Sequence, residues 1–244
     1  MKNSVCFLLI LFSLHCFSCD DDESTGPMQS NDSINKIMPL GASRVQGARP
    51  SFESYRYELW KLLLDGGYEF DYIGTREDEA NYPTYQDRTF DDDHEGRGGW
   101  RSDQILDGIE DWIAEAGIPD IVLFSSPGGN DMLQGRSYEQ AIDNINDIID
   151  ILQADNPSIT IIIEQLAPGK TEIMDAELTN AFNMMQVDVV EIANQQSTIS
   201  SNVIVVDMAT GFNDNLLADN VHYNQAGAEF IADRYFEVLE DILE

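Results

Sequence analysis

The stretch Lys36–Val45, with the sequence KIMPLGASRV, decides the fold. Its first half is an apolar run typical of a buried strand, and Gly41 lets the backbone turn sharply there because it lacks a Cβ atom. Ser43 then follows the carboxyl end of the strand, where open α/β sheets place their reactive groups. A serine in this place is a candidate nucleophile. Because turn serines are common, that assignment needs support from elsewhere in the chain.

Strand and helix patterns alternate along the rest of the chain. Short apolar runs predict further strands over residues 68–73, 120–125, 159–163 and 203–206. Apolar periodicity predicts helices over residues 54–65, 102–116, 138–154, 172–193 and 225–243, with long irregular segments over 75–99 and 209–221. Strict alternation favours the α/β class. We therefore expect a three-layer α/β/α sandwich around a flavodoxin-like parallel sheet of about five strands, ordered 2-1-3-4-5.

The amino terminus has the pattern of an export signal. Residues 1–18 contain one charged residue and a short apolar run, typical of a signal peptide. Cys19 and the acidic run after it resemble the start of a bacterial lipoprotein, which implies a lipid anchor on Cys19 and an outer-membrane or cell-surface location in a Gram-negative bacterium. The unusual Cys16 leaves an ordinary cleaved signal, and hence plain secretion, as the alternative. Residues 19–33 are predicted to form a polar tether, and residues 34–244 are predicted to form one domain.

Charge and cysteine content restrict the chemistry of that domain. The chain has a net charge of −32, so its surface repels nucleic acid and anionic membranes. We therefore expect no nucleic-acid partner and membrane contact only through the lipid anchor. All three cysteines lie at or before Cys19, which leaves the domain without a disulfide or a thiol nucleophile. Histidine chemistry there must use His94 or His222.

Four segments, one of which carries Ser43, are expected to meet at the carboxyl edge of the sheet. A serine becomes a good nucleophile when a base takes its proton, and His222 can be that base. Asp219, three residues earlier, can hold one nitrogen of the imidazole and fix its tautomer. The tetrahedral intermediate of acyl transfer carries an oxyanion, to which the backbone N–H groups of Ser43 and Gly99 and the side-chain amide of Asn130 can donate.

Each of these residues also has a structural interpretation. Asp219 could cap the helix that follows it, and His222 could be a surface histidine. Asn130 could stabilise its own turn, and Gly99 could be one more loop glycine. All four occur in the right order, each in a loop between a strand and a helix, and this combination favours a hydrolase site.

The chain resembles the SGNH or GDSL hydrolases, and most of all the acetylxylan esterases of carbohydrate esterase family 3. The resemblance covers nearly the whole domain and rests on the segments IMPLGASR, SYRYELWKLL, FDYIGT, DHEGRGGW, PDIVLFSSPGGND and DNVHYNQAG. It implies a Ser43–His222–Asp219 triad, an oxyanion hole of Ser43, Gly99 and Asn130, and no cofactor. The implied activity is removal of acetyl groups from an acetylated polysaccharide or oligosaccharide.

Three positions depart from the family pattern. Ala42 stands where the family has aspartate, Gly129 where it has threonine, and Tyr223 where it has proline. These changes leave the proposed nucleophile, donors and acid–base pair in place, and they affect the expected substrate more than the reaction. Two alternatives stay open: a lipase-like or lysophospholipid esterase on the same scaffold, and a non-catalytic carbohydrate-binding lipoprotein.

Three further residues are candidate substrate contacts. Trp100 lies in the same loop as Gly99, and we expect His94 to lie near the cleft without taking part in catalysis. The cation of Arg44, next to the nucleophile, is expected at the rim, either free to pair with a uronate or paired with a carboxylate of the segment Asp91–Glu95. That acidic segment could also hold a structural metal ion, but consecutive side chains alternate in direction, so we expect none.

Overall fold

The computed structural model describes residues 35–243. The predicted signal peptide (1–18), the predicted tether (19–33) and Cys19 lie outside these residues, so those predictions stay open. Of the helices between residues 35 and 243, none is both long enough and apolar enough to cross a membrane.

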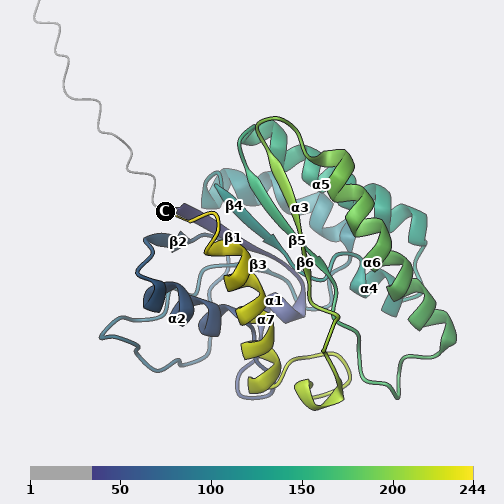
Figure 1. Cartoon of the computed structure of the whole chain (residues 1–244), viewed down its shortest axis with the longest axis horizontal. Coiled ribbons are helices and arrows are strands. Elements are labelled where there is room, and N and C mark those ends of the chain that lie inside the picture. Colours follow the sequence, from purple (N-terminus) through teal and green to yellow (C-terminus); the bar gives the residue numbers. More distant parts are fainter. Residues whose placement is uncertain (1–34, 244) are drawn as a thin grey trace, which may run out of the picture. The chain divides into compact units, whose positions relative to one another are not determined.

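The centre of the fold is a parallel sheet (Figure 1). Its strands are β1 (Asn35–Gly41), β2 (Phe70–Tyr72), β4 (Ile121–Phe124), β5 (Thr160–Gln165) and β6 (Asn202–Asp207). They lie in the order β2-β1-β4-β5-β6, and every pairing is parallel. The two-residue strand β3 (Glu95–Gly96) pairs with the carboxyl end of β1. Apart from β3, this is the predicted 2-1-3-4-5 order, so the α/β prediction is confirmed.

Helices cover both faces of the sheet (Figure 1). One layer holds α3 (Ser102–Ala116), α5 (Tyr138–Asp155) and α6 (Ala176–Gln196). The other holds α2 (Arg56–Gly66) and α7 (Gln225–Leu239), which pack against each other. Short helices α1 (Ser43–Gln46) and α4 (Gly129–Leu133) follow β1 and β4 directly, and a 3₁₀ turn, η1 (Asp214–Leu216), follows β6.

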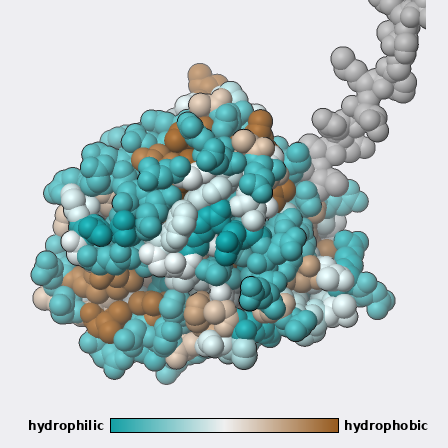
Figure 2. All heavy atoms as spheres, turned by 180° about the vertical axis from the view of Figure 1, so that it is seen from behind, coloured by the Kyte–Doolittle hydropathy of each residue, from teal (hydrophilic) through white to brown (hydrophobic). Residues whose placement is uncertain are grey.

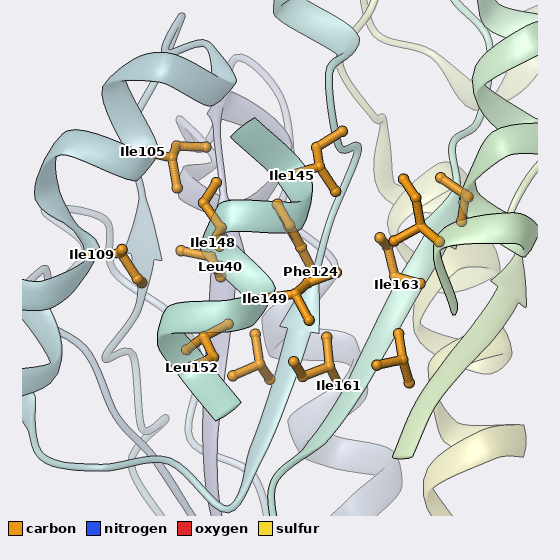
Figure 3. Packing of buried hydrophobic residues seen from close by; sticks show 14 of the residues in the cluster. Leu40, Ile105, Ile109, Phe124, Ile145, Ile148, Ile149, Leu152, Ile161 and Ile163 are labelled. Carbon is orange, nitrogen blue, oxygen red and sulfur yellow. The ribbon is translucent and has the colours of Figure 1, made fainter. Parts of the chain in front are cut away.

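Side chains of successive strand residues point to opposite faces of the sheet, so they pack into two separate cores. On β4, Val122 and Phe124 face the α3/α5/α6 layer, whereas Leu123 faces α2 and α7. Figure 3 shows the first core, where Leu40, Phe124, Ile161 and Ile163 of the strands meet isoleucines of α3 and α5. Buried on both faces, the strands read as the continuous apolar runs expected of a parallel sheet.

Several element ends differ from the prediction for local reasons. Helix α6 begins at Ala176 and not at residue 172, because the Asp175 side chain caps it by accepting from the backbone N–H of Leu178 at 2.9 Å. The predicted irregular segment 75–99 contains only β3, and the segment 209–221 contains η1. Ser137 caps α5, because its side chain accepts from the backbone N–H of Gln140.

The outer surface is mostly hydrophilic, in keeping with the large negative charge. Seen from behind, hydrophobic side chains gather in only a few small areas (Figure 2). The carboxyl ends of the five long strands all point to one edge of the sheet, since every pairing is parallel. The loops that follow β1, β4, β5 and β6 therefore surround one region, and the candidate site lies there.

Candidate active site

The candidate nucleophile stands at the first residue of α1, two residues past the last residue of β1. The turn between them is tight: a Cβ atom on Gly41 would lie 2.9 Å from the carbonyl oxygen of Ser125. Glycine is therefore required there for close packing against the end of β4. Because Ser43 is a first-turn residue, its backbone N–H has no acceptor within the helix and is available to a ligand.

The candidate base and its carboxylate form a compact turn before α7. One oxygen of Asp219 accepts from the backbone N–H groups of Val221 and His222, at 2.9 and 2.8 Å. The other lies 2.7 Å from Nδ1 of His222. Burial tends to raise the pKa of Asp219, but the hydrogen bonds from Val221 and His222 hold that pKa below its usual value. The ionised carboxylate can only accept, so Nδ1 carries the proton and Nε2 is the free basic nitrogen.

Asp219 does not cap the helix that follows it. Helix α7 is capped by Asn224, whose side chain accepts from the backbone N–H of Gly227 at 3.0 Å. Asp219 therefore has no capping role. The ring of His222 stacks on Phe52, with centroids 3.9 Å apart and planes 12° apart. The imidazole is thus held by a carboxylate at one edge and by an aromatic face.

The chain brings Ser43 and the His222 loop to the same cavity. Ser43, Asn130 and Val221 all line it, and the residue after Val221 is His222. Between residues 35 and 243 no hydrogen bond joins the Ser43 hydroxyl to the His222 ring. Hydrogen bonds of this kind often tighten only when substrate is bound.

The two other expected oxyanion donors, Gly99 and Asn130, lie in two segments that hydrogen bonds join. The side-chain amide of Asn130 donates to the carbonyl oxygen of Trp100 at 2.7 Å, and that of Gln134 to the carbonyl oxygen of Gly99 at 3.0 Å. The backbone N–H of Gly98 donates to Oε1 of Gln46 at 2.6 Å, which joins this loop to α1. Gly99 has a φ of +78° and open space where a Cβ atom would stand, so its backbone can be approached from outside.

The cavity beside Ser43 is small and mainly apolar. It has a volume of about 30 Å³, and its apolar walls are contributed by Leu133, Leu166 and Phe182. That volume holds on the order of two water molecules. A two-carbon acyl group on the Ser43 oxygen fits such a space, whereas a long acyl chain would extend beyond it.

A buried carboxylate that the sequence analysis did not find lies beneath the site. Glu164, on β5, accepts from the backbone N–H of Ser126 at 2.7 Å and from the hydroxyl of Tyr235 at 2.8 Å. Burial raises the pKa of Glu164. Ser126 lines the cavity and has a left-handed φ of +49°, which Glu164 holds in place. The only signal in the sequence was a glutamate at the end of an apolar strand.

Arg44 is not at the rim, so both predictions for its cation are wrong. It is 8 % exposed, and its guanidinium donates to the carbonyl oxygens of Val221, Ala167 and Pro168, at 2.8, 2.7 and 3.0 Å. The ring of Tyr223 lies 4.8 Å away. The N–H groups of the guanidinium donate to backbone carbonyls. The guanidinium therefore forms an ion pair with neither a substrate carboxylate nor the segment Asp91–Glu95.

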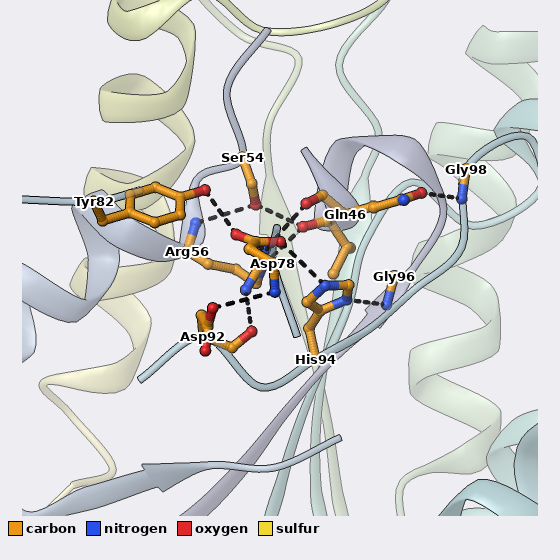
Figure 4. A network of polar contacts seen from close by, with 10 residues as sticks. Gln46, Ser54, Arg56, Asp78, Tyr82, Asp92, His94, Gly96 and Gly98 are labelled. Carbon is orange, nitrogen blue, oxygen red and sulfur yellow. Dashed lines mark hydrogen bonds and ion pairs between the residues drawn. The ribbon is translucent and has the colours of Figure 1, made fainter. Parts of the chain in front are cut away.

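His94 is also buried, in a polar network that the sequence analysis missed (Figure 4). Its Nδ1 accepts from the backbone N–H of Gly96 at 2.8 Å, and its Nε2 lies 3.3 Å from Asp78. Asp78 binds Nη2 of the fully buried Arg56 through both oxygens, at 2.7 and 2.8 Å. Burial, together with the Arg56 charge, lowers the pKa of His94 to about 4, so the ring is neutral. At 1 % exposure it cannot contact a substrate, and that prediction is wrong.

Trp100, the last candidate substrate contact, and Asp131 both make structural contacts within the protein. Trp100 packs against Trp112, with ring centroids 5.6 Å apart, and the Arg97 guanidinium lies over both rings. Asp131, next to Asn130, is buried and accepts from the backbone N–H and hydroxyl of Ser102, which fixes α4 against α3. Within residues 35–243, no three His, Cys, Asp or Glu side chains converge as metal ligands.

Comparisons with known proteins agree with this fold. The chain matches the GDSL-like Lipase/Acylhydrolase family over residues 64–230. This match includes Gly99, Asn130, Asp219 and His222 and begins after Ser43. The chain belongs to that family and has the SGNH hydrolase fold. It is therefore a carboxylic ester hydrolase.

Solved structures at 27 % identity include three esterases. A carbohydrate esterase family 3 protein from Talaromyces cellulolyticus gives a TM-score of 0.72 over 85 % of this chain and 97 % of that one. A family 3 carbohydrate esterase from Clostridium thermocellum gives 0.69 over 85 % and 96 %. A serine-to-alanine mutant of an acetyl esterase, with acetate ion, gives 0.73 over 85 % and 97 %. The search of curated proteins found no match.

Proposed function

We propose that this protein is a serine esterase that removes acetyl groups from a polysaccharide or oligosaccharide. The observation that carries the proposal is the small apolar cavity bounded by Ser43 and Asn130, because its volume of about 30 Å³ suits an acetyl group. The similarity to carbohydrate esterases and to an acetyl esterase with acetate ion supports the same substrate class.

In the first half of the reaction, the Ser43 oxygen attacks the acetyl carbonyl carbon while Nε2 of His222 takes the hydroxyl proton. Asp219, 2.7 Å from Nδ1, holds the ring in the required tautomer and stabilises its positive charge. The backbone N–H groups of Ser43 and Gly99 and the amide of Asn130 donate to the oxyanion. Collapse of the intermediate breaks the bond to the sugar oxygen, which takes the proton from His222 and leaves as a free hydroxyl.

In the second half, His222 takes a proton from water, whose oxygen attacks the acetyl carbon bound to Ser43. The second tetrahedral intermediate uses the same donors. Its collapse breaks the bond to Ser43, returns the proton to the serine oxygen, and releases acetate. Apart from the attacking water, the groups that act on the substrate in both proposed steps belong to this chain.

Acyl-chain preference tests this proposal against the lipase-like alternative. The test measures kcat/KM for p-nitrophenyl acetate, butyrate and octanoate. We expect acetate to be preferred over octanoate by at least about 100-fold, because the small cavity beside Leu166 and Phe182 accommodates a two-carbon acyl group and a longer chain would have to leave it. A preference for octanoate would favour the lipase-like enzyme, and no turnover of any ester would favour a non-catalytic carbohydrate-binding protein.

We further propose that the enzyme is exported and anchored by a lipid on Cys19. The leader pattern of residues 1–18 and the acidic residues after Cys19 support this placement. An anchored enzyme with a polar tether over residues 19–33 would meet extracellular polysaccharide at the cell surface. The experiment that tests this proposal is given in the Discussion.

A further inference from the structure

A second, larger cavity opens beside the small one. It has a volume of about 630 Å³ and lies between α6, the loop after β5 and the loop that leads into η1. The two cavities share Gly169 and Phe182 as lining residues, so one continues into the other. Its volume is in the range of ligand-binding pockets, which run from about 300 to 1,000 Å³.

We propose that this groove, defined by residues 168–186 and 209–215, binds the neutral sugar chain that carries the acetyl group. The inference rests on the proposed function and deepens it, because it names where the leaving sugar and its neighbours lie. Ser43, Gly169 and Phe182 line the same small cavity, and Gly169 and Phe182 also line the groove. A sugar bonded to an acetyl group at Ser43 can therefore extend across this shared wall into the groove.

One wall of the groove is a polar stripe on α6. Thr179, Asn183 and Gln186 line it at a spacing of four and then three residues, which puts them on one face of the helix. Asn183 is exposed, and between residues 35 and 243 its side-chain amide has no hydrogen-bond partner. Gln186 donates to the carbonyl oxygen of Leu166 at 3.1 Å, which fixes its side chain and leaves its own oxygen as an acceptor.

The opposite wall is the loop after β6. Phe212 lines the groove, and Tyr223 and Phe230 pack edge-on against its ring, with centroids 5.9 and 5.7 Å away. Asp214 accepts from both the backbone N–H and the hydroxyl of Thr171, which joins this wall to the loop after β5. A fixed aromatic ring offers an apolar surface to the C–H groups of a sugar, while amides both donate to and accept from its hydroxyls.

The charge of the groove selects a neutral chain. Among its lining residues Asp214 is the only charged one, in a protein whose net charge is −32. No lysine or arginine is among the lining residues, so an acidic glycan would meet no lining cation and would be repelled by the surrounding surface. The buried position of Arg44 removes the cation that the sequence had offered for a uronate.

The test blocks the groove and leaves the small cavity open. In Asn183→Trp a bulky ring replaces an exposed amide on the groove wall. The matched control is Asn194→Trp, which makes the same change on the same helix, three turns further along and outside the groove. For wild type and both variants, kcat/KM is measured on p-nitrophenyl acetate and on acetylated xylohexaose and mannohexaose.

We expect Asn183→Trp to lower kcat/KM on the wild type's preferred acetylated hexaose at least tenfold, mainly through KM, and to leave p-nitrophenyl acetate within twofold. Asn194→Trp is expected to match wild type on all substrates. Equal rates of Asn183→Trp and wild type on the hexaoses, or equal losses on both kinds of ester, would overturn the groove assignment. So would a wild type that hydrolyses p-nitrophenyl acetate but neither hexaose. A wild type inactive on every ester would instead refute the proposed function itself.

Discussion

Nε of Arg44 donates to the carbonyl oxygen of Val221 at 2.8 Å, across 177 positions of the chain. Arg44 directly follows the proposed nucleophile, and Val221 directly precedes the proposed base. The bond therefore holds the segment of the proposed nucleophile next to the segment of the proposed base, although the two lie near opposite ends of the domain. Two further bonds to the carbonyl oxygens of Ala167 and Pro168 bring in the loop that forms the shared wall of the two cavities.

Replacing Arg44 tests this connection. Arg44→Lys is expected to lower the free energy of unfolding by about 2–4 kcal/mol, because one ammonium group cannot reach three carbonyls and some are left buried without a donor. Activity on neutral and uronate-containing acetylated glycans is expected to fall by the same factor, since the Arg44 guanidinium donates to backbone carbonyls and not to a uronate. The control is Arg234→Lys, a half-buried arginine with a single carbonyl partner, Thr210. A selective loss on the uronate substrate would contradict the structural role.

The sequence predicted the sheet because buried parallel strands are continuous apolar runs, which are local patterns. The segments that follow the carboxyl ends of these strands carry the candidate residues Ser43, Asn130 and the Asp219–His222 pair. The partners of Arg44 could not be predicted, because they are backbone carbonyls distant in sequence and a carbonyl has no residue-type signature. Helices α1 and α4 have four and five residues, too few for an apolar period to show.

The triad is tested by three substitutions. Ser43→Ala and His222→Ala are expected to lower kcat for p-nitrophenyl acetate by at least about 10³-fold, since each removes a group that bonds or transfers a proton. Asp219→Asn is expected to cost roughly 10²–10⁴-fold, because an amide can donate to Nδ1 and favour the wrong tautomer. Circular dichroism checks that each variant is folded. If His94→Ala is inactive and His222→Ala keeps its rate, the base is assigned wrongly.

Asn130→Ala tests the oxyanion hole. Loss of one side-chain donor is expected to lower kcat by about 10²–10³-fold with little change in KM, because the bond strengthens only when the oxyanion forms. Gln134→Ala is the matched control: this amide binds the carbonyl oxygen of Gly99 in the same loop but does not line the cavity. It is expected to lose less than about tenfold. If kcat falls equally in the two variants, Asn130 only holds the loop in place and does not stabilise the oxyanion.

The lipid anchor is tested by fractionation of cells that express the full chain. Cys19→Ser removes the thiol to be lipidated, so the protein is expected to move from the membrane fraction to the soluble fraction. Specific activity on p-nitrophenyl acetate is expected to stay unchanged, because the domain is not altered. Cys6→Ser, in the same leader, is the control and keeps the membrane location. If Cys19→Ser and wild type distribute alike, there is no lipid anchor on Cys19.

The buried His94 makes the fold sensitive to acid. Its pKa is about 4 in the folded protein, and about 6.5 is usual for an unfolded chain. Between these values the unfolded state binds a proton that the folded state does not, so the contribution to stability is complete above pH 6.5 and is lost as the pH falls towards 4. Between pH 7 and pH 5 this loss amounts to about 2 kcal/mol.

His94→Asn separates this effect from the titration of the many carboxylates. The asparagine oxygen can still accept from the backbone N–H of Gly96, which His94 binds at 2.8 Å, but it does not titrate. The variant is expected to be less stable than wild type at pH 7, because the contact with Asp78 is lost, and the gap is expected to narrow by about 2 kcal/mol at pH 5. Urea unfolding at pH 7 and pH 5 measures this difference in the free energy of unfolding between wild type and variant.

Tyr82→Phe is the control. It removes another contact to Asp78 without removing the imidazole, so it should keep the wild-type pH dependence. An unchanged gap for His94→Asn would mean that the ring is not the source of the acid sensitivity.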